Sequence, residues 1–248
     1  MATKIEWTER TWNPVTGCTK VSEACQNCYA EVMSRRLKGM GQKKYANGFK
    51  VTLHPECLNE PYSWKKPCMV FVVSMGDLFH KDVPFEYIDE IFKVIKDTPQ
   101  HTYQILTKRA DRLFDYYFSH INICDKPKNV WLGVTCESRE HYWRVDVLRD
   151  IFGAGVRFIS CEPLLGSLHD INLNGIDWVT AGGESGNRAR PTNEYWVRSL
   201  RNRCVETETA FFFKQWGTWG GDGIRRSKKE NGCLLDGVEW KQMPKVLL

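Results

Sequence analysis

Met69-Val70-Phe71-Val72-Val73, followed at once by Ser74-Met75-Gly76-Asp77, is the stretch of sequence that decides the fold. Five apolar residues in a row do not alternate with polar ones, which is typical of a strand buried on both faces of a parallel sheet. Apolar residues at helical spacing follow between Phe85 and Asp97. This region therefore predicts a buried strand, a polar turn and a helix that covers the strand. The apolar positions of that helix are Phe85, Ile88, Ile91, Phe92 and Ile95.

The same strand, turn and helix recur along the chain. Successive strands are separated by roughly 20 to 35 residues, which is the length of a βα unit. We therefore predict an α/β fold, a partial (βα) barrel of about six or seven parallel strands that is TIM-barrel-like. The further strands are expected at residues 103–106, 130–134, 156–159, 178–181 and 210–213, with one more near 11–16. The further helices are expected at residues 29–37, 110–117, 139–152 and 192–205.

The composition favours one domain. The chain has 248 residues, of which 42% are hydrophobic, and this is enough for one sizeable core. No linker or low-complexity stretch interrupts it, so we predict the partial barrel over residues 1–216 and a small C-terminal β extension packed on it over residues 217–248. Asn231-Gly232 and Asp236-Gly237 indicate tight β turns in that extension.

Length and charge patterning also bear on location. The longest apolar run, from Cys68 to Met75, is far shorter than the ~18 residues that a membrane span requires. Residues 1–7 contain no apolar stretch of the kind found in secretory signals, so we expect a cytoplasmic protein without membrane contact. A net charge of +5, from 35 Lys and Arg against 30 Asp and Glu, means that an anionic partner is not repelled.

Polar and charged side chains follow six of the predicted strands. Parallel α/β sheets form their active sites at the carboxyl ends of the strands, so we expect these residues to ring one site. Helix caps and polar turns explain any single one of them more simply, but not the whole set. The set comprises Ser74, Asp77 and His80; Thr107, Lys108 and Arg109; Thr135 and Glu137; Ser160 and Glu162; Gly182, Gly183, Glu184 and Ser185; and Lys214, Gln215 and Trp216.

Three cysteines near the N-terminus carry the strongest chemical signal. Cys18, Cys25 and Cys28 have the spacing C-x6-C-x2-C in a loop that leads into a predicted helix, so their thiolates can converge on one metal centre. A structural zinc site needs a fourth protein ligand, for which His54, Cys57 or Cys68 are candidates. A 4Fe–4S cluster held by three cysteines keeps one iron open for a ligand. We favour the cluster, with zinc and unligated thiols as the alternatives.

The remaining cysteines have a simpler interpretation. Buried free cysteines behave as small hydrophobic residues, and these are scattered along the sequence. Cys136 and Cys161 differ from the others because both fall at strand ends, where they can contact the site. The cysteines assigned to the core or surface are Cys57, Cys68, Cys124, Cys204 and Cys233.

At this point the chain resembles the radical S-adenosylmethionine superfamily, in which three cysteines lie in a loop at the mouth of a partial (βα) barrel. More closely, residues 5–220 resemble a phage and prophage family of three-cysteine-motif proteins of unassigned function. The stretches that carry this resemblance are Trp12-Asn13-Pro14, Met75-Gly76-Asp77-Leu78-Phe79-His80, Leu106-Thr107-Lys108-Arg109, Ser160-Cys161-Glu162-Pro163, Gly182-Gly183-Glu184-Ser185-Gly186 and Phe212-Phe213-Lys214-Gln215-Trp216.

The resemblance implies an enzyme with a 4Fe–4S cluster and S-adenosylmethionine as cofactors. The cluster, bound by Cys18, Cys25 and Cys28, would receive an electron from an external donor and cleave S-adenosylmethionine to a 5′-deoxyadenosyl radical, which abstracts a substrate hydrogen. Acids suit the ammonium of the cofactor, whereas lysines suit a carboxylate or phosphate. The residues expected to bind the cofactor are Tyr29, Ser74, Asp77, Glu137, Gly182, Gly183, Glu184 and Gln215. The residues expected to be catalytic are Lys108, Glu162 and Lys214.

Two basic regions bear on the substrate. Arg35, Arg36 and Lys38 follow the cysteine loop, and residues 225–229 contain four cations close to Trp216 and Trp219. Cations interleaved with aromatic rings hold phosphates and stack bases, so a nucleobase or nucleic acid is the expected substrate, as in the hypermodification of phage DNA. The alternatives are the same radical chemistry on a peptide or small metabolite, and a zinc-stabilised nucleic-acid-binding protein without catalysis.

Overall fold

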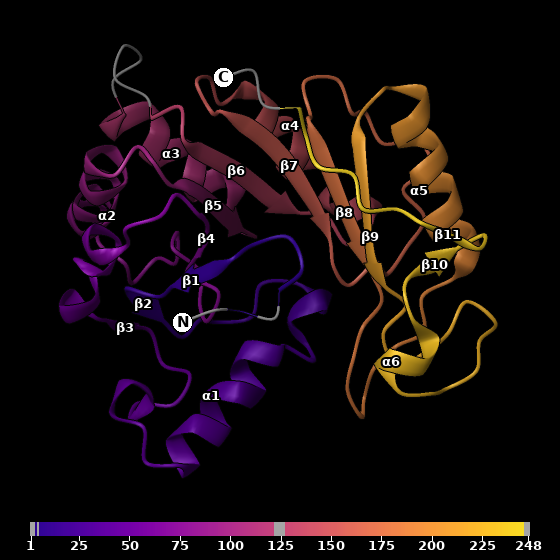
Figure 1. The fold of residues 1–248 in the computed structure, drawn as a ribbon, viewed down its shortest axis with the longest axis horizontal. Coiled ribbons are helices and arrows are strands. Elements are labelled where there is room, and N and C mark those ends of the chain that lie inside the picture. The colour runs from indigo at the N-terminus through magenta and orange to yellow at the C-terminus, as the bar shows by residue number, and fades with distance from the viewer. Residues whose placement is uncertain (1–2, 4, 122–126, 246–248) are drawn as a thin grey trace. The chain divides into compact units, whose positions relative to one another are not determined.

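The computed structural model describes residue 3 and residues 5–121 and 127–245; Cys124 lies outside these described residues. Within them, seven strands form one sheet in the order β1-β4-β5-β6-β7-β8-β9 (Figure 1). Neighbouring strands of the sheet follow one another along the chain, and the recorded pairs are parallel. The order never reverses, as it would in a doubly wound sheet, so the predicted α/β partial barrel is confirmed. The strands are β1 (Arg10–Trp12), β4 (Met69–Val72), β5 (Thr102–Thr107), β6 (Val130–Thr135), β7 (Val156–Cys161), β8 (Trp178–Gly182) and β9 (Ala210–Gln215).

The chain divides into two compact units. The first comprises residues 1–132 and 151–155, and the second comprises residues 133–150 and 156–248, so that the division falls within β6. The boundary predicted after residue 216 stays a prediction. No helix among the described residues has the length and apolar character that crossing a membrane requires. The helices are α1 (Tyr29–Gly39), α2 (Phe85–Asp97), α3 (Ala110–His120), α4 (Tyr142–Asp150), α5 (Glu194–Glu206) and α6 (Lys228–Asn231).

The first unit is built on β1, β4 and β5. Val70 is paired with Arg10 on one side and with Tyr103 on the other, and it is completely buried, as the unbroken apolar run predicts. The face of α2 that carries Ile88 and Ile91 is also completely buried. A short antiparallel pair of strands, β2 (Val15–Thr16) and β3 (Thr52–Leu53), flanks the cysteine loop. The single strand expected near residues 11–16 is divided between β1 and β2, and β3 has no counterpart in the sequence-based prediction.

The second unit is built on β7, β8 and β9. All five residues of β8 are buried, and Trp178 packs between Phe158 at 5.6 Å and Phe212 at 5.9 Å, measured between ring centroids. The helix expected at residues 139–152 is shorter than predicted, because a 3-10 turn (Arg139–His141) precedes α4.

The C-terminal segment adds strand pairing to the second unit. Phe213 N donates to Trp240 O at 2.8 Å, and Phe212 and Lys241 form an antiparallel bridge beside β9. β10 (Leu234–Leu235) and β11 (Val238–Glu239) pair antiparallel. The small β extension is therefore present, with Asp236-Gly237 at its turn. The tight β turn predicted at Asn231-Gly232 is wrong, because Asn231 ends α6 and Gly232 caps that helix.

The backbone is tightly packed around Gly183, which directly follows β8. A Cβ at this position would lie 1.8 Å from Trp216 O, whereas at Gly182 the nearest atom would be 3.5 Å away. Because backbone atoms cannot yield as a side chain does, we expect Gly183→Ala to lower the free energy of unfolding by about 3 kcal/mol. The matched variant Gly182→Ala should change it by less than about 1 kcal/mol. Urea denaturation measures both values, and equal midpoints for the two variants would contradict this packing.

Candidate functional site

The cysteine loop begins at the carboxyl ends of β1 and β4. Gly17 N donates to Met75 O at 2.9 Å, and Gly17 forms a parallel bridge with Gly76. Gly17 has a φ of 86°, and a Cβ there would lie 2.2 Å from Lys50 O. Only glycine meets both conditions. The chain is therefore held against the end of β4 immediately before Cys18.

Asn13 joins this loop to the turn after β4. Its Oδ1 accepts hydrogen bonds from Met75 N at 3.0 Å and from Ser74 Oγ at 3.2 Å. The hydroxyl of Tyr29 donates to the carbonyl of Ser74. Tyr29 and Ser74, both predicted to bind the cofactor, are thus brought together. Asn13 belongs to a motif of the sequence, but no local pattern marks its positioning role, because its partners lie 61 and 62 residues away along the chain.

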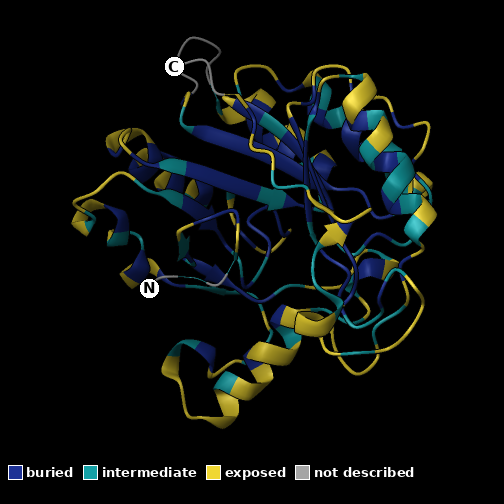
Figure 2. Cartoon of the chain, turned by 45° about the vertical axis from the view of Figure 1, so that its right-hand side comes forward, coloured by how far each residue is buried: buried dark blue, intermediate teal, exposed yellow. Residues whose placement is uncertain are grey.

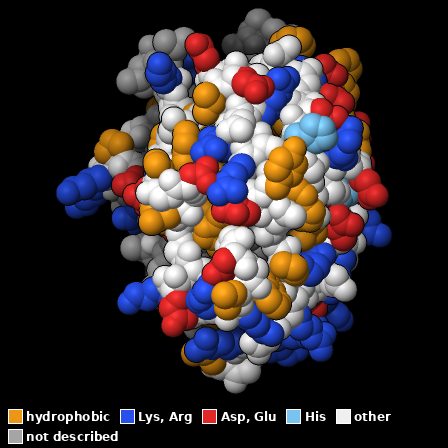
Figure 3. Space-filling view, turned by 90° about the vertical axis from the view of Figure 1, so that its right-hand side faces the viewer, with side chains coloured by type: hydrophobic (Ala, Val, Ile, Leu, Met, Phe, Trp, Pro, Cys, Tyr) orange, Lys and Arg blue, Asp and Glu red, His pale blue; other side chains and the backbone are white. Residues whose placement is uncertain are grey.

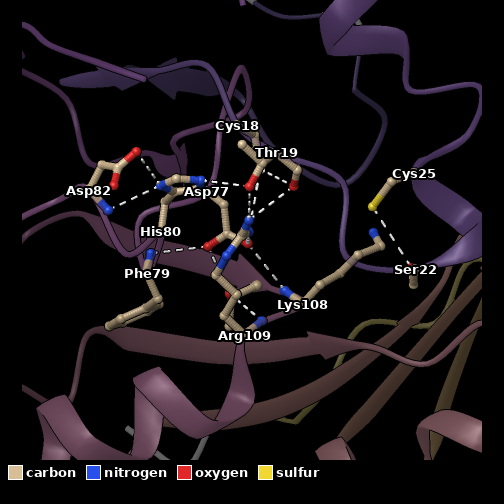
Figure 4. A network of polar contacts seen from close by, with 11 residues as sticks. Cys18, Thr19, Ser22, Cys25, Asp77, Phe79, His80, Asp82, Lys108 and Arg109 are labelled. Atoms are coloured by element: carbon tan, nitrogen blue, oxygen red, sulfur yellow. Dashed lines mark hydrogen bonds and ion pairs between the residues drawn. The ribbon is translucent and has the colours of Figure 1, made fainter. Parts of the chain in front are cut away.

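A single arginine holds the first cysteine (Figure 4). Arg109 Nη1 donates to Asp77 Oδ2 at 2.7 Å and to Cys18 Sγ at 3.3 Å, while its Nη2 donates to Thr19 O at 2.9 Å. The Arg109 and Asp77 side chains are only 11% and 7% exposed. The fork of the guanidinium therefore ties the turn after β4 and the loop after β5 to the cysteine loop.

Asp77 is fully engaged within the first unit. Besides Arg109, its carboxylate accepts hydrogen bonds from Thr107 Oγ1 at 2.7 Å, from Phe79 N at 3.0 Å and from Lys108 N at 3.4 Å. Four donors match what a carboxylate can accept. The assignment of Asp77 to the cofactor ammonium stays a prediction, but its contacts here position the loops.

Thr19 and His80 complete the network. Asp82 N donates to Nδ1 of His80 at 3.1 Å, so the ring hydrogen lies on Nε2, which is 2.8 Å from Thr19 Oγ1 and donates to it. The His80 side chain is completely buried. Burial, followed by the charge of Arg109, lowers the pKa of His80. A neutral imidazole therefore supports the residue next to Cys18.

The three cysteines are free thiols, each partly exposed. Burial, followed by the charge of Asp77, raises the pKa of Cys18 to about 11, and Cys25 is near enough to contribute to this shift. Cys25 Sγ lies 3.8 Å from Ser22 Oγ, while Cys28 packs against the cluster of Ala30, Tyr45 and Met75.

The thiols of Cys18, Cys25 and Cys28 are ligands of the kind that a soft metal centre binds, although their sulfur atoms are not gathered around one point. Within the part of the chain that the structure describes, no three His, Cys, Asp or Glu side chains are arranged as a metal site. Three unbonded thiols on one anchored loop are nevertheless the ligands that iron–sulfur clusters take. Lys108, predicted to be catalytic, extends its side chain in the direction of Ser22 and Cys25 in Figure 4.

In the second unit, the predicted catalytic residues Glu162 and Lys214 form an ion pair. Lys214 Nζ lies 2.6 Å from Glu162 Oε2, and Thr180 Oγ1 donates to Glu162 Oε1 at 2.9 Å. The Lys214 and Glu162 side chains are 22% and 16% exposed. They come from β9 and the end of β7, on either side of β8, so an acid and a base meet at neighbouring strand ends. Thr180 was not singled out in the sequence, because an internal strand threonine has no distinctive pattern.

The end of β8 is also held by charge. Glu184 accepts hydrogen bonds from Arg190 N at 2.8 Å, from its Nε at 3.0 Å and from its Nη2 at 2.7 Å. Gln215 Nε2 donates to Ser185 Oγ at 3.2 Å, but Gln215 Oε1 is buried without a hydrogen-bond partner. Gly183 is required by the carbonyl of Trp216, so its presence has an explanation apart from ligand binding.

Glu137, which was predicted to bind the cofactor, lies inside the second unit, and that assignment stays a prediction. Its side chain is completely buried, with Arg144 Nη1 at 2.9 Å and His141 Nε2 at 3.2 Å. The His141 contact is close enough for an ion pair but lacks hydrogen-bond geometry, so we assign the pairing of Glu137 to Arg144. Cys136 and Cys161 are also completely buried, and burial raises the pKa of both thiols.

The basic residues near the C-terminus lie beside the loop that follows β8. Arg225 lies over the ring of Trp219 at 5.9 Å and donates to Asn187 O at 2.7 Å, while Arg226 pairs with Asp222 at 2.7 Å. Lys and Arg side chains gather in the lower part of the face shown in Figure 3. The cations that the sequence places close to Trp219 thus include one, Arg225, that lies over its indole ring.

Comparisons with known proteins bear on the family and the fold. A family model described as "Protein of unknown function (DUF5131)" matches residues 2–244, and no curated protein matches the sequence. Among solved structures, a cysteine-to-serine mutant of spore photoproduct lyase aligns with a TM-score of 0.50 at 15% identity, covering 91% of this chain and 69% of the other.

Two further structures of the same lyase align less closely. The lyase complexed with dinucleoside spore photoproduct has a TM-score of 0.45 at 14% identity, covering 77% of this chain and 59% of the other. A double mutant with bound AdoMet and dinucleoside spore photoproduct has a TM-score of 0.43 at 13% identity, and the alignment covers 79% of this chain and 61% of the other. The chain thus spans about three fifths of these two lyase chains. At these identities the likeness concerns the fold.

Replacement of Arg109 tests whether this arginine holds the cysteine loop in place. Arg109→Ala leaves a buried Asp77 carboxylate without its charge partner, so we expect it to lower the free energy of unfolding by about 3 kcal/mol. Amide hydrogen exchange in residues 17–20 should become at least about tenfold faster, because Thr19 O loses its donor. Arg109→Lys, which keeps the charge without the fork, should recover part of the stability but not the protection. Unchanged exchange in Arg109→Ala would show that the arginine does not hold the loop.

Proposed function

The chain belongs to the DUF5131 family, described as proteins of unknown function, and from that premise we propose that it is a radical S-adenosylmethionine enzyme with a 4Fe–4S cluster. One observation carries the proposal. Three free cysteines lie on a loop that is hydrogen-bonded to the carboxyl end of a parallel strand in a partial (βα) barrel. Active sites of such sheets form at that end. The fold likeness to spore photoproduct lyase at a TM-score of 0.50 is consistent with this assignment.

In this proposal Cys18, Cys25 and Cys28 hold the cluster. When bound, the cluster supplies one electron that cleaves S-adenosylmethionine to a 5′-deoxyadenosyl radical, which abstracts a substrate hydrogen. Arg109 keeps Cys18 in place, and its positive charge partly offsets the burial and the Asp77 charge that raise the pKa of this thiol. Tyr29 and Ser74 lie next to the cysteines and are the groups of the first unit that we assign to the cofactor.

The second unit supplies acid–base and binding groups. The ion pair of Glu162 and Lys214 can hold or move a proton at Glu162 Oε2, since the ammonium donates to that oxygen. Gln215 Oε1 is a buried acceptor without a partner, so a hydrogen-bond donor of the cofactor or substrate would satisfy it. Glu184, Gly182 and Glu137 complete the proposed binding set, with Glu184 held in place by Arg190.

We propose that the substrate is a nucleobase or nucleic acid in the bacterial cytoplasm, as in the modification of phage DNA. Arg225 over the Trp219 ring supports this assignment, because such a pair offers a phosphate contact and a stacking surface together. The exposed cations of residues 225–229 extend the same surface. The alternative substrate is a peptide or a small metabolite.

The cluster is tested by metal analysis. Protein purified without oxygen should be brown and hold about four irons per chain. Cys18→Ala, Cys25→Ala and Cys28→Ala should each retain less than about one iron, because three ligands are the minimum that the proposal allows. Cys233→Ala, a part-exposed cysteine elsewhere in the chain, is the matched control and should keep its iron.

The same preparations test catalysis. After reduction in the presence of S-adenosylmethionine, the wild-type protein should release 5′-deoxyadenosine, detectable by mass spectrometry, and the three cysteine variants should not. A colourless protein that holds zinc would overturn the cluster assignment. A brown protein that never forms 5′-deoxyadenosine would overturn the radical reaction while leaving the cluster in place.

Nucleic-acid binding is tested at Arg225. Arg225→Ala/Arg226→Ala should raise the Kd for a single-stranded DNA oligonucleotide about tenfold and reduce the slope of log K against log salt by about one, because Arg225 supplies the phosphate contact while Arg226 is paired with Asp222. Lys93→Ala/Lys96→Ala removes the same charge from the exposed side of α2 and should leave both values unchanged. Fluorescence anisotropy measures the affinities. Equal affinities for both double variants would count against a nucleic-acid substrate at this surface.

A further inference from the structure

Cys57 lies beside a lysine amine and a carboxylate in the first unit. Its Sγ accepts a hydrogen bond from Lys44 Nζ at 3.0 Å, and the Glu60 carboxylate is within hydrogen-bond reach of the same thiol. Burial raises the pKa of Cys57, while the hydrogen bond from Lys44 lowers it. A thiol, an amine and an acid therefore meet at one point of the chain, apart from the three cysteines of the loop.

Small molecules can reach this point. Cys57 is 8% exposed, and Lys44 and Glu60 are half-buried. Figure 2 shows α1 exposed along most of its length, and the connection that follows it toward Lys44 is exposed as well. Hydrogen peroxide is scarcely larger than water, so it can reach a sulfur with this exposure, whereas a bulky thiol such as glutathione cannot. An oxidised Cys57 is therefore left to react with its own neighbours.

We propose that Lys44 and Cys57 are an oxidative modification site, which hydrogen peroxide converts to a covalent S–N cross-link. In the first step the Cys57 sulfur attacks one peroxide oxygen. The S–O bond forms, the O–O bond breaks and water leaves, so that sulfur is oxidised by two electrons to a sulfenic acid and the peroxide is reduced.

The second step needs no further oxidant. Lys44 Nζ attacks the Cys57 sulfur, the S–N bond forms and the S–O bond breaks. The hydroxyl leaves as water with one proton of the ammonium, and the Glu60 carboxylate accepts the other. The product is a sulfenamide between the two side chains.

The positions of the neighbours favour Lys44 as the group that traps the sulfenic acid. Sulfenic acids condense with a thiol or with a nitrogen. Cys57 is a free cysteine, and the charged side chains recorded as acting on its thiol are Lys44 and Glu60, neither of which offers sulfur. Of these two, only the lysine carries a nitrogen, and it already lies 3.0 Å from the sulfur.

The cross-link would close the segment that braces the cysteine loop. Between Lys44 and Cys57, Phe49 O accepts a hydrogen bond from Cys18 N at 3.2 Å, and β3 pairs with β2 just before the loop. Joining the two ends of this segment restricts the unfolded chain, as a disulfide does. We therefore expect the modified protein to keep its cysteine loop folded under oxidising conditions. This role goes beyond the proposed function and does not depend on it.

Peptide mapping tests the cross-link. The full-length protein is treated with hydrogen peroxide in the absence of thiol reductants and is then digested with trypsin. Because trypsin does not cleave after a modified lysine, we expect residues 44–50 joined to residues 51–65. The mass of the joined peptides should be lower than the sum of their separate masses by two hydrogens. Dithiothreitol should separate them again.

Lys44→Arg is the matched variant, because it keeps the positive charge and the N–H donors without the nucleophilic amine. Its Cys57 should stay a sulfenic acid and be labelled by dimedone, whereas Cys57 of the wild type should not. Cys68 is the internal control, since its Sγ lies 3.4 Å from the imidazole of His101. Cys68 should be labelled to the same degree in both proteins.

Thermal unfolding tests the effect on the fold. The oxidised wild type should have a Tm about 5 °C above that of oxidised Lys44→Arg, and the reduced proteins should have equal values. Equal Tm values after oxidation would show that the cross-link does not brace the loop.

The other outcomes decide the site itself. Wild-type Cys57 that is labelled by dimedone and not joined to Lys44 would overturn the proposal. So would a Cys57 that stays a free thiol in both proteins. No step involves iron or S-adenosylmethionine, so a protein without a cluster would count against the proposed function and leave this site standing.

Discussion

The contact of the Arg109 guanidinium with Asp77, Cys18 and Thr19 is the interaction on which the cysteine loop depends. Removing two charges from water costs several kcal/mol per ion, and the attraction of the pair offsets this only where the remaining donors and acceptors are satisfied. Here Asp77 accepts from four donors, and Arg109 also binds a backbone carbonyl. The pair is therefore stable only when the turn after β4, the loop after β5 and the cysteine loop are all in place.

The second unit follows the same rule with different residues. Glu162 pairs with Lys214, Glu184 with Arg190 and Glu137 with Arg144, each near the carboxyl end of a strand. The exposure of these acids decreases from Glu162 to Glu137, and the ability to meet a ligand decreases with it. Glu162 and Lys214 keep access to solvent, which is why we assign the proton chemistry to them. That both units contribute to one ring of polar residues stays a prediction.

Much of the fold follows from short-range patterns. Six of the predicted strands lie within one or two residues of their expected positions, since an unbroken apolar run is typical of a strand buried on both faces of a covered parallel sheet. The strand expected near residues 11–16 ends in the sheet at Trp12. The limits of α2 agree with the prediction, because its apolar spacing is regular from Phe85 onward. The sequence does not identify Asn13 and Thr180 as positioning residues, because their partners are distant along the chain and no local pattern marks them.

By itself, the sequence determined the α/β partial barrel, the strand ends that carry polar residues and the cysteine loop, because periodicity, spacing and residue type are local properties. The tertiary structure alone decided which charges pair. Asp77 meets Arg109, and Gly183 meets the carbonyl of Trp216, across separations that no local pattern spans. It also decided that one side of α1 stays exposed, because the exposure of a helix face depends on which other parts of the chain pack against it.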